Sequence, residues 1–153
     1  MRRIPIKDFY IKAGVVDLKP AEIQTAIIIP KESYEGYYGH YIKYAMRNAM
    51  DIATTGCSVN VKLSEDKKTI LDARIAYGVA GPVPMRAPSA EAKIRGKETG
   101  RAAVKEFAQA VLEDINPRDS WRAAKDFREH IATVLAERAL CESIRLAGGE
   151  VHE

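Results

Sequence analysis

Three charged side chains recur at intervals of four residues in an otherwise uncharged part of the sequence. Lys43, Arg47 and Asp51 lie within "YIKYAMRNAMDIATTGCSVNVKL", residues 41–63. Because side chains at even spacings along a strand share a face, a regular strand would place all three on one side. Two cations in such a row can stabilise negative charge on a bound group. The alternative is a solvated strand edge with an arginine–aspartate ion pair, which adds little stability when exposed.

No other group of residues carries chemistry by itself. The sequence has no GxGxxG, P-loop or HExxH motif, and its three histidines, His40, His130 and His152, are far apart. Cys57 and Cys141 have no metal-ligand spacing, and we expect both to be buried free thiols. The sequence therefore predicts no catalytic and no metal-binding residues, and the chain is expected to act beside something else.

Length and composition are those of one globular domain. The chain has 153 residues, 46% of them hydrophobic, and a net charge of +3 that is too small to indicate a nucleic-acid partner. The longest apolar run, "TAIIIP", is far shorter than a membrane-spanning helix, and the N-terminus lacks the apolar stretch of a signal peptide. We expect a cytoplasmic protein with no membrane contact.

The first half of the chain has the alternation and turn residues of strands. The expected strands cover residues 21–30, 40–46, 54–63 and 69–82. The polar turn 64–68 indicates a hairpin between the last two. In the second arm, Ile70 is expected on the face opposite to Leu71, Ala73 and Ile75.

From Pro84 onward the apolar residues recur at helical spacing. The expected helices are a short one at 90–96 capped by Ser89, one at about 100–114, and a long one capped by Asp119 or Ser120. The long helix is expected to turn Phe127, Ile131 and Leu135 inward and its arginines, Arg128 included, to solvent. Strands followed by helices predict an α+β fold, an antiparallel sheet of three or four strands with three helices on one face.

Two sequence patterns, in this order and spacing, are similar to those of a known family. The first is Lys-x-x-x-Arg-x-x-x-Asp-Ile-Ala at 43–53, and the second is "GVAGPVPMRAPSAE" at 78–91. With "NPRDSWRAAKDFREHIATVLAERAL" at 116–140, they resemble the C-terminal domain of the FAD-binding, or medium, subunit of molybdenum hydroxylases. These are enzymes of the xanthine dehydrogenase and carbon monoxide dehydrogenase type. The bacterial xanthine dehydrogenase subunit is the most similar, and the resemblance covers about residues 9–148.

The resemblance implies a βββααα domain packed behind a larger FAD-binding domain. In this family electrons pass from a molybdopterin site through two 2Fe-2S clusters to FAD, and then to NAD or another acceptor. The matching lysine, Lys43, would reach the flavin, where a cation favours the negatively charged reduced form. Arg47 and Asp51 match positions that border the flavin. Gln24 matches a position that some members use to touch the isoalloxazine ring.

The resemblance also implies partners. Residues 1–20 would be an extended segment at the end of a missing FAD-binding domain, residues 21–149 the flavoprotein C-terminal domain, and residues 150–153 a disordered tail. The glycine-rich loops that grip the FAD pyrophosphate are absent, so FAD would be bound mainly by a domain not present in this chain. The chain would then be either a fragment or the product of a split gene. The implied partners are that FAD-binding half, a molybdenum subunit and an iron–sulfur subunit; a homodimer is also compatible. The chain alone is expected to be inactive.

Two other functions remain open on the residues. A pure subunit-interaction domain without flavin contact is suggested by a group of tyrosines and the missing FAD loops; the tyrosines are Tyr34, Tyr37, Tyr38, Tyr41 and Tyr44. A small basic nucleic-acid-binding domain is suggested by the strand–helix order and an isoelectric point near 8.8. The dispersed lysines and the lack of a GxxG loop or an aromatic RNA-binding motif argue against it, so we expect no nucleic-acid partner.

Overall fold

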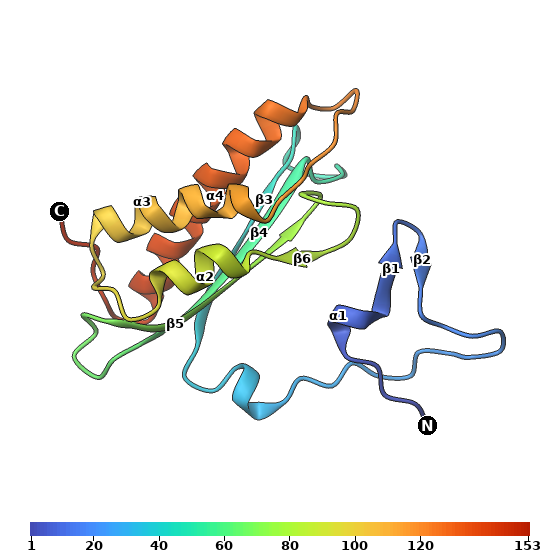
Figure 1. Cartoon of the computed structure of the whole chain (residues 1–153), viewed down its shortest axis with the longest axis horizontal. Helices are drawn as coiled ribbons and strands as arrows, with labels where there is room; N and C mark the ends of the chain where they lie inside the picture. The colour runs from blue at the N-terminus through green and yellow to red at the C-terminus, as the bar shows by residue number, and fades with distance from the viewer.

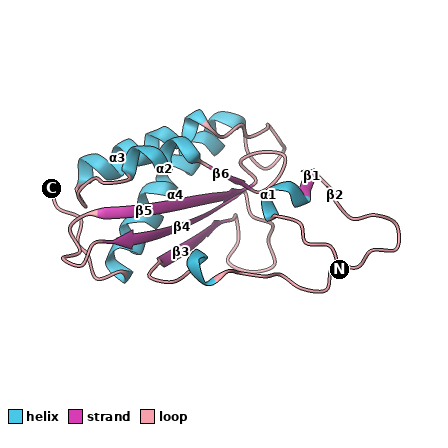
Figure 2. Cartoon of the chain, turned by 60° about the horizontal axis from the view of Figure 1, so that its bottom comes forward, coloured by secondary structure: helices cyan, strands magenta, loops and turns pink.

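A four-stranded antiparallel sheet with three helices on one face forms the body of the molecule. The computed structural model describes residues 1–153. The strands follow the order β3-β4-β5-β6, and all neighbours are antiparallel. Their bounds are β3 Tyr38–Tyr44, β4 Thr55–Leu63, β5 Ile70–Gly78 and β6 Met85–Arg86. The covering helices are α2 Pro88–Ile94, α3 Arg101–Ala110 and α4 Lys125–Leu146 (Figures 1 and 2). This arrangement confirms the α+β fold expected from the sequence.

The central strand β4 supplies the core of the sheet. Cys57, Val59 and Val61 face the helices and are fully buried, whereas Ser58 and Lys62 lie on the other face. This alternation is the one expected from the sequence, because a sheet covered on one side buries every second side chain.

A β-bulge changes the expected faces at the start of β5. Lys62 pairs with Asp72, but Leu63 pairs with Ile70, so Leu71 is the extra residue of the bulge. Ile70 is therefore fully buried together with Ala73, and Leu71 is 47% exposed. The sequence predicted that Leu71 shares the face of Ala73 and that Ile70 lies on the opposite face. Both placements were wrong, because the bulge shifts Ile70 to the face of Ala73.

Strand β6 has only two residues, and beyond its end the Glu91 carboxylate accepts the next hydrogen bond from β5. Beyond β6, the Ile75 N–H donates to Glu91 Oε1 (3.0 Å), on helix α2. The Glu91 carboxylate also accepts two hydrogen bonds from the Arg86 guanidinium, one of them 2.6 Å long. Glu91 is only 8% exposed. It thus joins the edge of the sheet to α2 and satisfies a backbone donor that would otherwise be buried without a partner.

The apolar stripe predicted for the second helix is confirmed, but the predicted cap of the first is not. Val104, Phe107 and Val111 of α3 and the following 3₁₀ turn, η2 Val111–Glu113, are buried. Helix α2 begins at Pro88 without a side-chain cap. Ser89 lies inside that helix, and its N–H and hydroxyl donate to the Asp114 carboxylate at 2.9 and 3.1 Å. Proline at the first helical position explains the early start.

The long helix α4 has the expected orientation only in part. Leu135 is buried, as expected, whereas Phe127 is 41% exposed. Ala132, Ala136 and Leu140 also face the core, and Arg128 is 3% exposed. The interpretation of Arg128 as a solvated residue was therefore wrong. Asp119 does reach the helix start, since its Oδ1 accepts the N–H of Lys125 at 2.7 Å, but the N-cap position is Ala124.

The N-terminal segment lies apart from the sheet and helices (Figure 1). It contains α1 Ile6–Phe9, the two-stranded pair β1 Tyr10–Lys12 and β2 Val15–Val16, and a 3₁₀ turn, η1 Lys31–Ser33. The strand expected at 21–30 is not formed. Residues 23–29 make no backbone hydrogen bond, because no other strand of the chain lies beside them.

The last residues pair with the body. The sequence predicts a disordered tail at 150–153, but the N–H of His152 donates to the Thr99 carbonyl (3.0 Å), and its carbonyl accepts from Arg101 (2.8 Å). None of the helices has the length and apolar composition needed to cross a bilayer.

Candidate functional site

The three charged residues at intervals of four frame a loop. Strand β3 ends at Tyr44, and Lys43 Nζ donates to the carbonyl of Asp51 at 2.6 Å. The Arg47 N–H donates to Asp51 Oδ2 (2.9 Å), and its guanidinium donates to the carbonyl of Met50 (2.8 Å). The structure therefore brings Lys43, Arg47 and Asp51 together, although not on one strand face.

Asp51 holds the shape of this β3–β4 loop, residues 45–54. Its side chain is 14% exposed, whereas that of Arg47 is 70% exposed. Burial raises the pKa of Asp51, but N–H donors from Arg47 and Met46 outweigh this effect, and the pKa lies below the ordinary aspartate value. An ionised aspartate that accepts nearby backbone N–H groups is a common loop stabiliser.

Lys43 stands on the uncovered face of the sheet beside small residues. Across the strands it pairs with Gly56, and Gly56 pairs with Gly78. A Cβ on Gly78 would meet nothing within 4 Å, whereas one on Gly56 would lie 2.8 Å from the Tyr41 hydroxyl. We call Lys43, Tyr41, Gly56 and Gly78 the sheet ledge. No carboxylate lies within 4 Å of the Lys43 ammonium.

Sequence reasoning missed Arg128, which fastens the loop to α4. Its guanidinium donates to the carbonyl of Thr54 and to Ser120 Oγ (2.7 Å), and its Nε is buried without a partner. Burial lowers the pKa of Arg128, and the charges of Arg118 and Arg122 lower it further. Helical periodicity gives no signal for such a residue, because its acceptor is a backbone carbonyl 74 positions away.

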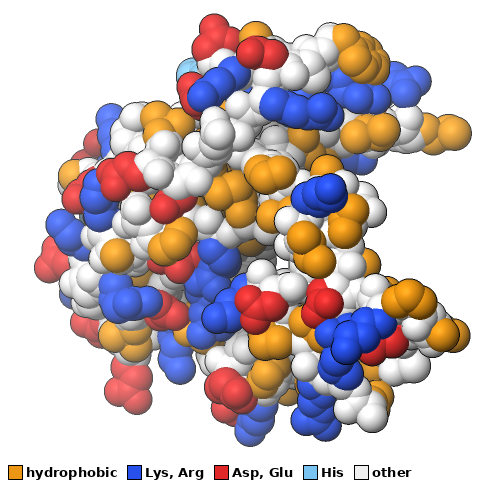
Figure 3. All heavy atoms as spheres, turned by 45° about the vertical axis from the view of Figure 1, so that its right-hand side comes forward, with side chains coloured by type: hydrophobic (Ala, Val, Ile, Leu, Met, Phe, Trp, Pro, Cys, Tyr) orange, Lys and Arg blue, Asp and Glu red, His pale blue; other side chains and the backbone are white.

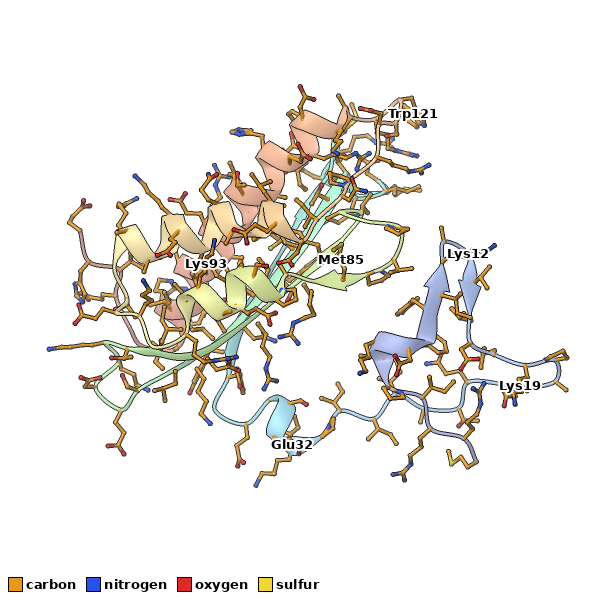
Figure 4. The ribbon with its side chains drawn as sticks, in the orientation of Figure 1. Lys12, Lys19, Glu32, Met85, Lys93 and Trp121 are labelled. Atoms are coloured by element: carbon orange, nitrogen blue, oxygen red, sulfur yellow. The ribbon has the colours of Figure 1, made fainter.

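The loop and the residues before α4 form one end of the molecule. Trp121, labelled at this end in Figure 4, is 82% exposed, and the Arg122 guanidinium lies 4.2 Å from its ring centre. Figure 3 shows Lys and Arg side chains gathered on the upper arm and a hollow between this arm and the lower lobe. Met46, Met50 and Ile52 of the loop are also exposed.

Gln24, the fourth expected site residue, lies elsewhere. It lines a cavity of about 1050 Å³ whose walls all come from residues 1–30. Lys43, Arg47 and Asp51 do not line this cavity, so the structure does not bring Gln24 to the other three.

No group of three or more metal-ligating side chains is present. Both cysteines are free; Cys57 is buried, which raises its pKa to about 12, and Cys141 is half-buried. Lys43 is a cation without a carboxylate partner on the sheet face where Gly78 is open and Tyr41 covers Gly56, and such a cation can stabilise an electron-rich or anionic group.

Comparison with known proteins places these features in context. Residues 40–143 match the family described as the CO dehydrogenase flavoprotein C-terminal domain. The chain is 35% identical over 151 residues to the putative xanthine dehydrogenase FAD-binding subunit of Escherichia coli K12, covering 99% of this chain and 51% of that protein. It is 30% identical over 141 residues to the glyceraldehyde dehydrogenase medium chain of Sulfolobus acidocaldarius, covering 92% and 48%.

A solved structure shows the same fold. The carbon monoxide dehydrogenase of Hydrogenophaga pseudoflava, in a form that lacks the Mo-pyranopterin moiety of its molybdenum cofactor, superposes with a TM-score of 0.80 at 26% identity. The match covers 95% of this chain and 49% of that chain. The chain therefore spans about half the length of the relatives that it matches.

Proposed function

The chain belongs to the CO dehydrogenase flavoprotein C-terminal domain family, and from this membership we propose that it forms one wall of the flavin site in a xanthine-dehydrogenase-type FAD subunit. The sheet ledge carries this proposal. Gly78 presents no side chain on the uncovered face, Gly56 is buried against the Tyr41 side chain, and Lys43 stands beside them without a competing carboxylate. A flat ring can approach the sheet at Gly78, and a nearby cation suits a ring that becomes negatively charged.

The residues of the ledge fit a flavin, which supplies two-electron chemistry when bound. Lys43 would place its ammonium near the pyrimidine end of the ring and favour the reduced, anionic form. Asp51, through its carbonyl, orients that ammonium, and Arg47 holds Asp51 in turn. Gln24 would contact the ring from the N-terminal segment once that segment is docked on a partner.

The proposed setting is a multi-subunit oxidoreductase. Residues 21–149 would form the flavoprotein C-terminal domain, with residues 1–20 as the end of the FAD-binding domain. That FAD-binding half would hold most of the cofactor. A molybdopterin subunit and an iron–sulfur subunit with 2Fe-2S clusters would supply electrons, and NAD or another acceptor would remove them. A cytoplasmic location fits the two unpaired cysteines.

A pure subunit-interaction domain is the second candidate function. Exposed Trp121, Met46 and Met50 at one end of the molecule favour it, because exposed aromatic and methionine side chains are common at protein interfaces. Measuring the reduction potential of the flavin in a Lys43 variant distinguishes this role from a flavin contact.

The test is Lys43→Met in the chain assembled with its FAD-binding half, which keeps the apolar stem and removes the ammonium. Losing a charge-assisted interaction of about 1–2 kcal/mol with the reduced flavin lowers the two-electron potential by roughly 20–45 mV. Lys62→Met is the matched control, because Lys62 lies on the same sheet face at the far end of β4, with its ammonium 5.8 Å from the Tyr37 ring centre. Dye equilibration measures both potentials. An unchanged potential for Lys43→Met, or an equal shift for Lys62→Met, would leave the interaction domain as the better description.

A further inference from the structure

Strand β3, Tyr38–Tyr44, is an edge of the sheet with no neighbour on its outer side. It comes first in the strand order β3-β4-β5-β6, and Figure 2 shows it as the outermost strand with no further strand beside it. Tyr41 and Lys43 are exposed, whereas Ile42 and Tyr44 are partly buried. An uncovered edge carries backbone donors and acceptors with which another strand can pair.

The hydrogen bonds of the other strands fix which backbone groups of β3 point outward. On β5, the Ile75 N–H donates to Glu91 and its carbonyl accepts from Ala87, so both groups of Ile75 point away from β4. Val59 of β4 is paired with Ile75, and its own backbone groups must therefore point to the other neighbour, β3. There Val59 is paired with His40. The even-numbered residues of β3 are thus the ones bonded to β4.

The odd-numbered residues Gly39, Tyr41 and Lys43 therefore present their backbone N–H and carbonyl groups at the outer edge. None of the three has a backbone hydrogen bond to a turn or loop. The edge also lacks the features that commonly prevent strand pairing. It contains no proline, its register with β4 runs without a bulge, and Lys43 is its only lysine. The β3 edge is thus open to a further strand.

We propose that the β3 edges of two copies of this chain pair antiparallel, with Tyr41 on the two-fold axis. Tyr41 then pairs with Tyr41 of the second copy, and Gly39 pairs with Lys43 of the second copy. Each outward N–H and carbonyl on both edges thereby gains a partner. Because each copy contributes four strands, the two sheets join into one continuous sheet of eight strands. The pairing needs no flavin and is independent of the proposed function.

The edge is self-complementary in this one register, which is why a second copy is the occupant. Moving the axis to His40 or Ile42 leaves Lys43 or Gly39, respectively, opposite a residue outside the partner strand. Moving the axis to Lys43 sets two ammonium groups opposite each other, which is destabilising. With the axis at Tyr41, each Lys43 lies opposite a glycine, and the two like charges are separated.

The same register covers the aromatic side chains of the edge. Tyr41 is 58% exposed and Tyr38 is 48% exposed. In the dimer, Tyr38 of one copy lies opposite Tyr44 of the other, whose ring centre is 6.0 Å from that of Phe127 on α4. Aromatic pairs across antiparallel strands add stability beyond the backbone bonds. The strand of seven residues is only about 24 Å long, so we expect a small interface and a weak dimer.

Sedimentation velocity of the full chain tests the assembly, and amide hydrogen exchange measured by NMR tests the surface. We expect a monomer of 17.0 kDa at about 1 µM and a dimer at about 200 µM. In the dimer, the amides of Gly39, Tyr41 and Lys43 should exchange at least about tenfold more slowly than in the monomer. The amides of His40 and Ile42 are bonded to β4 and should be protected at both concentrations. A monomer throughout, or a dimer with the three edge amides unprotected, overturns the proposal.

Cysteine variants test the register. In a Cys141→Ser background, Tyr41→Cys places two thiols across the axis, at a Cα separation of about 5.5 Å that a disulfide can span. Lys43→Cys is the control, because the two Lys43 positions lie about 14 Å apart in this register. With diamide as oxidant, we expect a cross-linked dimer for Tyr41→Cys and none for Lys43→Cys. Equal cross-linking of the two variants, or none with Tyr41→Cys, overturns the proposal.

Tyr41→Pro and Tyr41→Ala separate backbone pairing from contact between the aromatic rings. Both variants remove the ring, but only proline removes the outward N–H, a change that edge strands tolerate. We expect Tyr41→Pro to weaken dimerisation by about tenfold or more relative to Tyr41→Ala, with circular dichroism checking that both chains are folded. Equal dimerisation by the two folded variants overturns the proposal. If Tyr41→Pro does not fold, the cross-linking of Tyr41→Cys against Lys43→Cys decides.

Discussion

Replacing Glu91 by leucine tests whether the carboxylate that joins β5, Arg86 and α2 holds the edge of the sheet. Leucine has a similar volume, but it leaves the Ile75 N–H in an 8%-exposed site without its acceptor. An unsatisfied buried donor costs about 1–3 kcal/mol. Arg86, whose side chain is 51% exposed, can be rehydrated, so its lost ion pair adds about 1 kcal/mol or less. The expected loss of unfolding free energy is therefore about 1–4 kcal/mol.

Urea and thermal unfolding followed by circular dichroism measure this loss. For a chain of this size the melting temperature should fall by roughly 2–15 °C. Glu91→Gln keeps an oxygen for the Ile75 N–H and should cost about 1 kcal/mol, mostly from the pairing with Arg86. Glu113→Gln is the control, because its pair with Lys93 is exposed and its loss should not be measurable. If Glu91→Leu and Glu91→Gln destabilise equally, the buried N–H does not carry the effect and the reasoning fails.

Thiol labelling under native conditions should modify Cys141 well before Cys57, because Cys57 is fully buried and burial raises its pKa to about 12. Mass spectrometry of samples taken over time measures the order of labelling, and equal rates would contradict the packing of β4. Acid should weaken the fold partly through Asp72: burial raises its pKa, but the Tyr37 hydroxyl and Arg95 outweigh this and hold it below the ordinary value. Its stabilising contribution is therefore present above the unfolded-state pKa, about 3.9, and is lost as pH falls through the folded value. Asp72→Asn should flatten the unfolding free energy against pH in that range, and an unchanged profile would argue against the network.

The regular parts of the fold could be predicted because their pattern is local. Strand β4 and the stripe of α3 alternate at the periods that a covered sheet and an amphipathic helix require. The face of Ile70 could not be predicted, because the extra residue of the bulge moves each side chain that precedes it in β5 to the opposite face of the sheet. In α4 the inward position of Leu135 was predicted correctly and that of Phe127 was not, because the core side of the helix is built largely from alanines and the larger Phe127 suggested a different face.

The candidate site was predictable only in part. Spacing alone singled out Lys43, Arg47 and Asp51, but it suggested a strand face where the chain forms a loop around the Asp51 carboxylate. Arg128 gave no sequence signal, since what it binds is the carbonyl of Thr54. The strand expected at 21–30 had the right residue types, and it is absent because strand formation depends on a neighbour as well as on propensity.

The exposed isoleucines of residues 23–29 affect how a cell treats copies that have not assembled. Short, β-branched, uncharged segments in an extended form promote aggregation, and they are what chaperones and proteases recognise on incomplete proteins. A contact that covers these isoleucines would remove this signal, and a copy without such a contact keeps displaying it. Surplus copies would then be degraded, with the same seven residues marking them.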